Sequence, residues 1–142
     1  MSRPTLSSVE VGLQLPELIV RFRRSDLVRY AGASGDFNII HWNERTALAV
    51  GLPGVIAHGM LTMGQAINVV TRWTGDPTSV VDYQVRFTKP VVVPDDDAGV
   101  DVVFAGKVSA INEDGTVKVD LSARFDGSPV LARASALVRL PA

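Results

Sequence analysis

The sequence HGMLTMGQAINVVTRW at residues 58–73 predicts one helix that is apolar or small around most of its circumference. The main polar exceptions are Thr62, Gln65, Asn68 and Arg72. A helix that is apolar on nearly every face is buried in a core, because no side of it is suited to water. At this length it is also too short and too polar to cross a bilayer. We therefore expect the rest of the chain to wrap around this helix.

The chain after this helix changes from helical to strand periodicity. Apolar residues occupy alternate positions in four segments, at 81–87, 100–104, 117–125 and 130–140. Turn residues connect them, and short turns between long strands indicate antiparallel hairpins or a meander. An antiparallel sheet with one buried face and a long central helix is typical of an α+β hot-dog fold. We assign residues 1–142 to a single domain of this kind.

The first fifty residues are expected to add one strand and two short helices. Apolar residues alternate over 18–22, which suits a half-buried strand. Ser25 is a suitable N-cap for a helix at 26–33, which nearby glycines would end. Asn43 is a suitable N-cap for a second helix at 44–50, with an acidic residue in its first turn.

Composition excludes several classes of function. The 142 residues are 46% hydrophobic and 20% charged, as in one globular domain. Fourteen basic and fifteen acidic side chains give a net charge of −1 without basic clusters, so we expect neither a nucleic-acid nor a membrane partner. The absence of cysteine excludes disulfides and cysteine-ligated metals. The start, MSRPTLSSVEVG, does not read as a secretory signal, and we expect a cytoplasmic protein.

Both histidines of the protein lie in the irregular segment 30–60, where polar side chains gather between apolar elements. Asp36 and His41 are close enough in sequence to face one pocket if the loop between them curls. An imidazole exchanges protons near neutral pH, and a nearby carboxylate can orient it, hold a water or act as a second acid–base group. The alternative is that Asp36 caps a turn and His41 is a hydrogen-bonded core histidine.

Gly59 lies in the first turn of the predicted central helix, directly after His58. A glycine there lets a ligand approach a free backbone N–H, and the helix dipole favours negative charge, so a thioester carbonyl would fit. The alternative is that Gly59 only permits close packing of helix on sheet. His41 and His58 are far apart in sequence and match no metal-binding spacing, so we expect no metal. The glycines form no nucleotide-binding motif, and Ser34 lacks the context of a nucleophilic serine.

The residues between Tyr30 and Met60 resemble the signature of the MaoC-like, or (R)-specific enoyl hydratase, family of hot-dog proteins. The matching residues are Tyr30, Ala31, Ser34, Gly35, Asp36, Asn38, His41, Ala47, Gly51, Leu52 and Ile56 to Met60. Outside this stretch, SSVEVGLQLPE at 7–17, WTGDP at 73–77 and VRFT at 85–88 are similar to the (3R)-hydroxyacyl-ACP dehydratase branch of that family.

The resemblance implies a reaction and a site. The reaction is the reversible dehydration of a (3R)-hydroxyacyl thioester, carried by ACP or CoA, to a trans-2-enoyl thioester in fatty-acid elongation. The family's catalytic pair corresponds to Asp36 and His41, and its thioester-polarising amide corresponds to Gly59. We expect the substrate to be contacted by Ser34, Asn38 and His58.

The resemblance also implies partners. It implies no metal or redox cofactor, and it implies a homodimer or a heterodimer with another hot-dog subunit. A non-catalytic acyl-binding subunit of such a heterodimer remains an alternative, and a hot-dog thioesterase is a further one. The chain departs from the family at Ile39, where a proline is usual. Losing that proline frees φ and restores an N–H, which is expected to loosen the spacing of Asp36 and His41.

Overall fold

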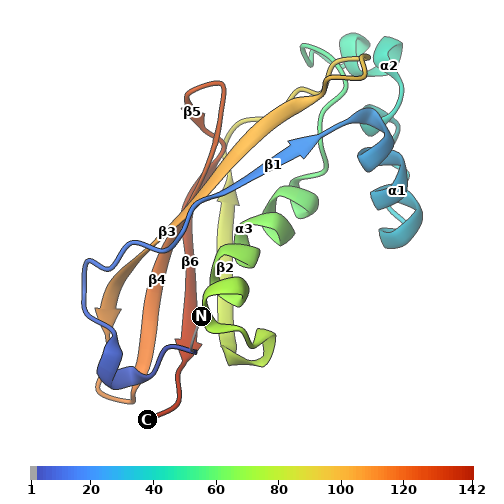
Figure 1. Cartoon of the computed structure of the whole chain (residues 1–142). Helices are drawn as coiled ribbons and strands as arrows, with labels where there is room; N and C mark the ends of the chain where they lie inside the picture. The colour runs from blue at the N-terminus through green and yellow to red at the C-terminus, as the bar shows by residue number, and fades with distance from the viewer. Residues whose placement is uncertain (1–2) are drawn as a thin grey trace.

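Alternating apolar residues build an antiparallel sheet, and one long helix, α3, packs on it (Figure 1). The computed structural model describes residues 3–142. The strands are β1 (Leu18–Phe22), β2 (Val80–Phe87), β3 (Val100–Ile111), β4 (Thr116–Phe125), β5 (Ser128–Pro129) and β6 (Leu131–Arg139). Their order is β1-β3-β4-β6-β2, and β5 pairs with β4. The predicted α+β hot-dog architecture is thus confirmed.

The connection between β2 and β3 is not the short turn that the sequence predicts. Strands β4 and β6 lie between β2 and β3 in the sheet, so residues 88–99 must cross from one part of it to another. Val91 and Val93 in this connection are buried, and the Val91 carbonyl accepts the Ala57 N–H at 2.8 Å. The connection is therefore a packed segment that lies beside the approach to α3. Prolines on either side of these valines conceal their inward orientation in the sequence.

Strand β6 contains an extra residue that shifts its alternation. Between the pairs Gln84↔Ser135 and Arg86↔Ala132, β6 has one residue more than β2. Arg133 lies in this bulge with a φ of 48°. As a result Leu131 is buried, whereas uninterrupted alternation predicts that Ala132 would be.

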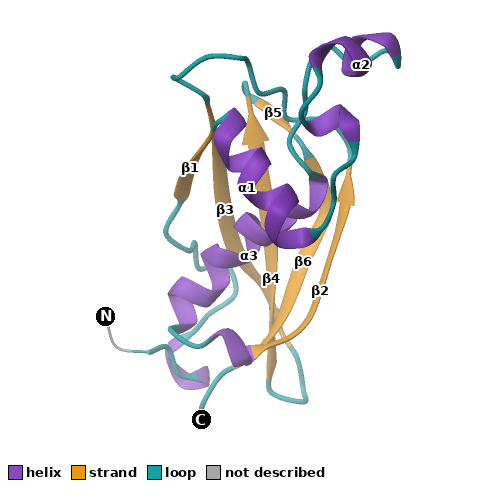
Figure 2. Cartoon of the chain, turned by 90° about the vertical axis from the view of Figure 1, so that its right-hand side faces the viewer, coloured by secondary structure: helices purple, strands orange, loops and turns teal. Residues whose placement is uncertain are grey.

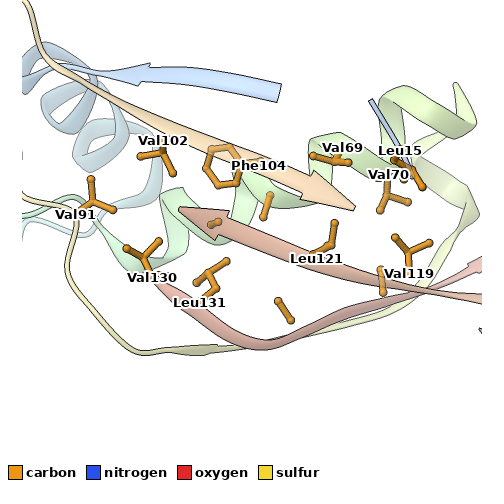
Figure 3. Packing of buried hydrophobic residues seen from close by; sticks show 14 of the residues in the cluster. Leu15, Val69, Val70, Val91, Val102, Phe104, Val119, Leu121, Val130 and Leu131 are labelled. Carbon is orange, nitrogen blue, oxygen red and sulfur yellow. The ribbon is translucent and has the colours of Figure 1, made fainter. Parts of the chain in front are cut away.

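Helix α3 (Gly59–Thr74) is buried along one face only, contrary to the expectation of burial on nearly every side. Its buried residues are Thr62, Ala66, Val69, Val70 and Thr74. Met60 is exposed, because a single sheet covers only one side of a helix. On the buried side, a Cβ at Gly106 of β3 would come within 3.1 Å of Val69, so glycine allows the helix to approach the sheet closely without displacing that side chain. Figure 3 shows Val69 and Val70 packed with Phe104 and Val119 of the sheet.

Two shorter helices, α1 (Arg24–Ser34) and α2 (Glu44–Ala49), lie at the end of the sheet where α3 begins (Figures 1 and 2). The N-cap of α1 is Arg23, not Ser25 as predicted, because the Asp26 carboxylate accepts the Arg23 N–H at 2.9 Å. Asn43 caps α2 as predicted, by accepting the Thr46 N–H. Within residues 3–142, no helix is long and apolar enough to span a membrane.

Candidate active site

The loop between α1 and the 3-10 turn Ile39–His41 is shaped by its own polar side chains. Ser34 Oγ accepts the Asp36 N–H at 3.1 Å, Asp36 Oδ1 accepts the Asn38 N–H at 3.1 Å, and Asn38 Oδ1 accepts the Ile40 N–H at 3.3 Å. Each side chain thus binds the backbone two residues further on, as in Asx turns. These bonds shape the loop although Ile39 replaces the proline usual in the family.

His41 is held by a backbone carbonyl. Its side chain is 8% exposed, and Nδ1 lies 2.7 Å from the carbonyl oxygen of Ile56. A carbonyl oxygen can only accept a hydrogen bond, so the proton of the neutral ring sits on Nδ1. Nε2 then carries a free lone pair. This is the state that a proton-accepting histidine requires.

His58, the residue before α3, is 1% exposed and stacks on His41. The two ring centroids are 3.8 Å apart with an interplanar angle of 25°, and the Tyr30 ring lies 4.7 Å away on a tilted plane. His58 Nε2 lies 3.0 Å from the carbonyl oxygen of Asp36, so Nε2 carries the proton. Burial lowers the pKa of His58 below 6.5, an effect only partly opposed by Asp36.

The structure brings Asp36, His41 and His58 together. One polar atom from each lies within 4.8 Å of the others, although the sequence separates the histidines widely. The Asp36 side chain is exposed, whereas both imidazoles are buried. The lone pairs of an imidazole lie in its ring plane, so two nearly parallel stacked rings do not aim at a common point. This geometry suits proton transfer between Asp36 and His41 better than a shared metal ion.

A cavity of about 360 Å³ opens beside this cluster. It is lined by His41, Leu52, Ile56, Ala57, Gly59, Thr62, Phe87, Thr88, Lys89, Pro90, Val91, Val130 and Leu131. Among residues 3–142, nothing accepts the Gly59 N–H, which is one of the unpaired donors at the start of α3. The cavity therefore combines apolar walls with one imidazole and one free helix N-terminal donor.

Of the six residues expected at the site, only His41 and Gly59 line the cavity, and Asp36 lies beside His41. Ser34, Asn38 and His58 are not among the lining residues; each binds the backbone of the loop instead. Sequence reasoning missed the Ile56 carbonyl, because a backbone acceptor has no residue-type signal. It also missed Phe87 and Lys89, which reach the cavity from the end of β2 and the connection after it.

Comparisons with known proteins agree with the fold described above. Residues 7–124 match the model of a family described as MaoC like domain. The 3-hydroxyacyl-thioester dehydratase X of Mycobacterium tuberculosis is 40% identical over 80 residues, which are 56% of this chain and 27% of that protein. The 3-oxo-4,17-pregnadiene-20-carboxyl-CoA hydratase beta subunit of the same species is 29% identical over 114 residues, 80% of this chain and 84% of that subunit.

A solved structure of a MaoC-like dehydratase superposes on the chain with a TM-score of 0.92 at 41% identity, covering 97% of this chain and 42% of that one. The chain therefore spans about a quarter of the first of these curated relatives and about two fifths of this solved structure.

Proposed function

Because this chain belongs to the MaoC-like domain family, whose model matches residues 7–124, we propose that it catalyses the reversible dehydration of a (3R)-hydroxyacyl thioester to a trans-2-enoyl thioester. The observation that carries the proposal is the placement of His41: Nδ1 is bound by the Ile56 carbonyl, Asp36 lies within reach, and the ring lines the cavity beside Gly59. We propose that the thioester is carried by ACP or by CoA and that the reaction is a step of fatty-acid elongation.

The reaction assigns one task to each of three residues. In the dehydration direction, Nε2 of His41 takes a proton from C2, while the Gly59 N–H donates to the thioester oxygen and stabilises its enolate character. A protonated Asp36 gives its proton to the hydroxyl on C3, which leaves as water, and the C2–C3 double bond forms. The proton on His41 then passes to Asp36 through the water just formed, because a ring nitrogen of His41 and a carboxylate oxygen of Asp36 lie within 4.8 Å of each other, and both groups are restored. Hydration follows the same steps in reverse.

The apolar walls of the cavity are suited to the acyl part of the substrate. The scheme requires no metal or redox cofactor, because both protons move between side chains and substrate. We further propose that the chain works as a homodimer or as the catalytic half of a heterodimer with another hot-dog subunit. Its cytoplasmic location stays a prediction.

The test is to assay the purified full chain with a short and a long trans-2-enoyl-CoA and to determine the configuration of the product at C3. We expect (3R)-hydroxyacyl-CoA. Asp36→Asn and His41→Ala should each reduce kcat by roughly 100- to 10,000-fold, the range typical of acid–base groups. Asp120→Asn, at an exposed position of β4, is the matched control and should keep full activity. A folded Asp36→Asn variant with near-normal turnover would overturn the assignment.

The same assay separates the alternatives. A non-catalytic acyl-binding subunit would bind the thioester without turnover and would act only in the presence of a catalytic partner. A thioesterase would release free CoA instead of forming a hydroxyacyl thioester. Addition of a candidate partner subunit to an inactive, folded chain would distinguish a missing partner from an inactive site.

A further inference from the structure

We propose that His58 is a positioning residue, which holds both Asp36 and His41 in place and does not touch the substrate; this inference rests on the hydration–dehydration activity proposed above. His58 is 1% exposed and lies outside the set of residues that line the cavity. Its ring nevertheless contacts both members of the acid–base pair. The sequence alone suggested a substrate contact, and the burial of this side chain favours a role through its neighbours instead.

The first part of the role is a hydrogen bond that fixes the backbone of Asp36. The His58 Nε2–H donates to the Asp36 carbonyl at 3.0 Å and joins the loop to the start of α3. The other bonds of Asp36 are local: its N–H donates to Ser34 Oγ, and its carboxylate accepts the Asn38 N–H. Local turns set the shape of the loop but not its place relative to the cavity. The bond from His58 is the one that ties Asp36 to the helix on which Gly59 lies.

The second part is ring packing that fixes the plane of His41. The Ile56 carbonyl holds one edge of the His41 ring, but a single hydrogen bond leaves the ring free to rock about it. His58 covers one face of that ring at 3.8 Å and is itself packed against Tyr30 of α1. The stacked His58 ring, supported by the tilted Tyr30 ring, therefore restricts the direction in which Nε2 of His41 points.

The third part concerns charge. The titratable groups that face His58 are the Asp36 carboxylate, the His41 ring and the Tyr30 ring. His58 Nδ1 is buried without a partner within the described part of the chain, so a proton placed on it would have no acceptor. A cationic His58 would also lie 3.8 Å from the ring that must accept the C2 proton. Burial, which lowers the pKa of His58, keeps this neighbour uncharged at neutral pH.

Three variants separate the parts of the role. His58→Gln keeps an N–H donor and loses the ring, His58→Phe keeps the ring and loses the donor, and His58→Ala loses both. We expect kcat to fall by roughly 10- to 100-fold, most in His58→Ala, because displacements of about 1 Å have effects of this size. KM should stay within about twofold, since ground-state binding is unchanged. A raised KM at unchanged kcat would show a substrate contact and overturn the proposal.

The structural control is Thr74→Val, at the opposite end of α3. Thr74 is buried, and its Oγ1 donates to the Asp76 carbonyl at 2.9 Å, so this change also removes a buried hydrogen bond. It should lower the free energy of unfolding without changing kcat of the folded enzyme. Equal loss of kcat in Thr74→Val and His58→Ala would mean that general destabilisation explains the result.

Imidazole NMR tests the inference without any assay of activity. The protein has two histidines, so each His58 variant leaves one set of ring signals, that of His41. We expect His58 to carry its proton on Nε2 and to titrate below 6.5, and we expect the His41 ring signals to shift in His58→Phe and His58→Ala. Unchanged His41 signals would overturn the positioning role even if the wild-type enzyme is active. An inactive wild-type chain with these NMR results would count against the proposed function alone.

Discussion

The site depends on two imidazoles whose protons sit on different nitrogens. His41 donates through Nδ1 to the Ile56 carbonyl, whereas His58 donates through Nε2 to the Asp36 carbonyl. Because each ring has a carbonyl as its fixed partner, the remaining nitrogen of each is left without a proton at neutral charge. In His41 that nitrogen is available for reaction, and in His58 it is sealed inside the protein. Backbone acceptors thus give two identical side chains different chemistry.

Lys89 is expected to contribute to recognition of the substrate's carrier. It lines the cavity, its side chain is exposed, and none of the ion pairs within residues 3–142 includes it. CoA and the pantetheine arm of ACP both carry phosphate. Lys89→Met should therefore raise KM for an enoyl-CoA up to about fivefold, which corresponds to about 1 kcal/mol for an exposed charge pair. The KM for an N-acetylcysteamine thioester, which has no phosphate, should not change.

Lys107→Met, at an exposed position of β3 outside the cavity, is the matched control for Lys89→Met. Added salt should reduce the difference between wild type and Lys89→Met, because it screens exposed charges. An equal rise in KM for both kinds of thioester would contradict a phosphate contact.

His58 should also make the stability of the chain depend on pH. Its pKa is lowered by burial, so below about pH 6.5 the unfolded chain binds a proton that the folded chain does not. The free energy of unfolding should therefore fall as the pH drops from 7.5 to 5.5, by at most about 1.4 kcal/mol per pH unit for this one proton. Urea titrations of wild type and His58→Gln measure it, and the variant should show the smaller slope.

Three aspartates with lowered pKa values do not change their protonation between pH 7.5 and 5.5. Hydrogen bonds from threonine and arginine lower the pKa values of Asp76, Asp101 and Asp114 below 3.8, so these carboxylates remain ionised at pH 5.5. If wild type and His58→Gln lose stability in parallel, burial of His58 is not the cause.

The sequence allowed a prediction of which residues lie at the site mainly where the residue type itself suits a catalytic role. The family resemblance pointed to Asp36, His41 and Gly59; in the structure His41 and Gly59 line one cavity and Asp36 lies beside His41, and their catalytic roles stay a prediction. The roles of Ser34 and Asn38 in shaping the loop were not predictable, because a polar side chain in a loop suits a ligand as well as a backbone N–H.

The elements around the site meet at the first turn of α3. Gly59 begins this helix, and the end of β2 brings the Phe87 ring against it. The segment 55–57 that leads into α3 is held by the connection after β2: Ala57 donates to Val91, and Val93 donates to Val55. The free N–H of Gly59 is therefore fixed by two elements distant in sequence.

Gly59→Ala is expected to lower activity strongly. A Cβ at this position would lie 3.2 Å from three atoms of the Phe87 ring, so the ring must shift by a few tenths of an ångström. The new methyl group would also stand at the N–H that the thioester oxygen approaches. We expect kcat to fall by roughly 100-fold, as for loss of an oxyanion donor. Steady-state kinetics with a short enoyl-CoA measures this.

Two further variants interpret the Gly59→Ala result. Gly32→Ala, in α1, meets no atom within 4 Å and should raise stability by roughly 0.5–1 kcal/mol, as alanine does in an exposed helix. Adding Phe87→Leu to Gly59→Ala removes the crowded ring. Full recovery of kcat in the double variant would show that Gly59 serves packing alone, which was the alternative open from the sequence.

The existence of most elements was predictable, and their neighbours in the sheet were not. Alternation located β3, β4 and β6 because each has one face in the core. Alternation also predicted the strand β2, but it could not predict that β2 lies at the edge of the sheet. The strand order depends on how residues 88–99 cross the core. The bulge at Arg133 was equally hidden, since an arginine with φ of 48° has no sequence signature.

The two edge strands of the sheet differ in length and in how well they are protected from pairing with another chain. The edge strand β1 is short, and its Arg21 forms an ion pair with Asp101 of β3. Short length and charged side chains are features that protect a sheet edge from pairing with another chain. The opposite edge strand, β2, is longer, and its Val81 is 50% exposed. This strand has one unpaired edge, and its exposed Val81 and Phe87 favour pairing with another chain. It also lies beside the cavity, to which Phe87 contributes.

We expect this edge to form the dimer contact of the proposed enzyme. Sedimentation or light scattering of the purified chain should give a homodimer, or a monomer that becomes a heterodimer with another hot-dog subunit. Val81→Lys should shift the chain to monomer, because a lysine on an edge strand opposes pairing. Ile19→Lys, at an exposed position of β1, is the matched control and should leave the dimer intact. Because β2 also supplies Phe87 to the cavity, loss of the dimer should lower activity as well. A chain that is fully active as a monomer, with the same activity in Val81→Lys, would contradict this.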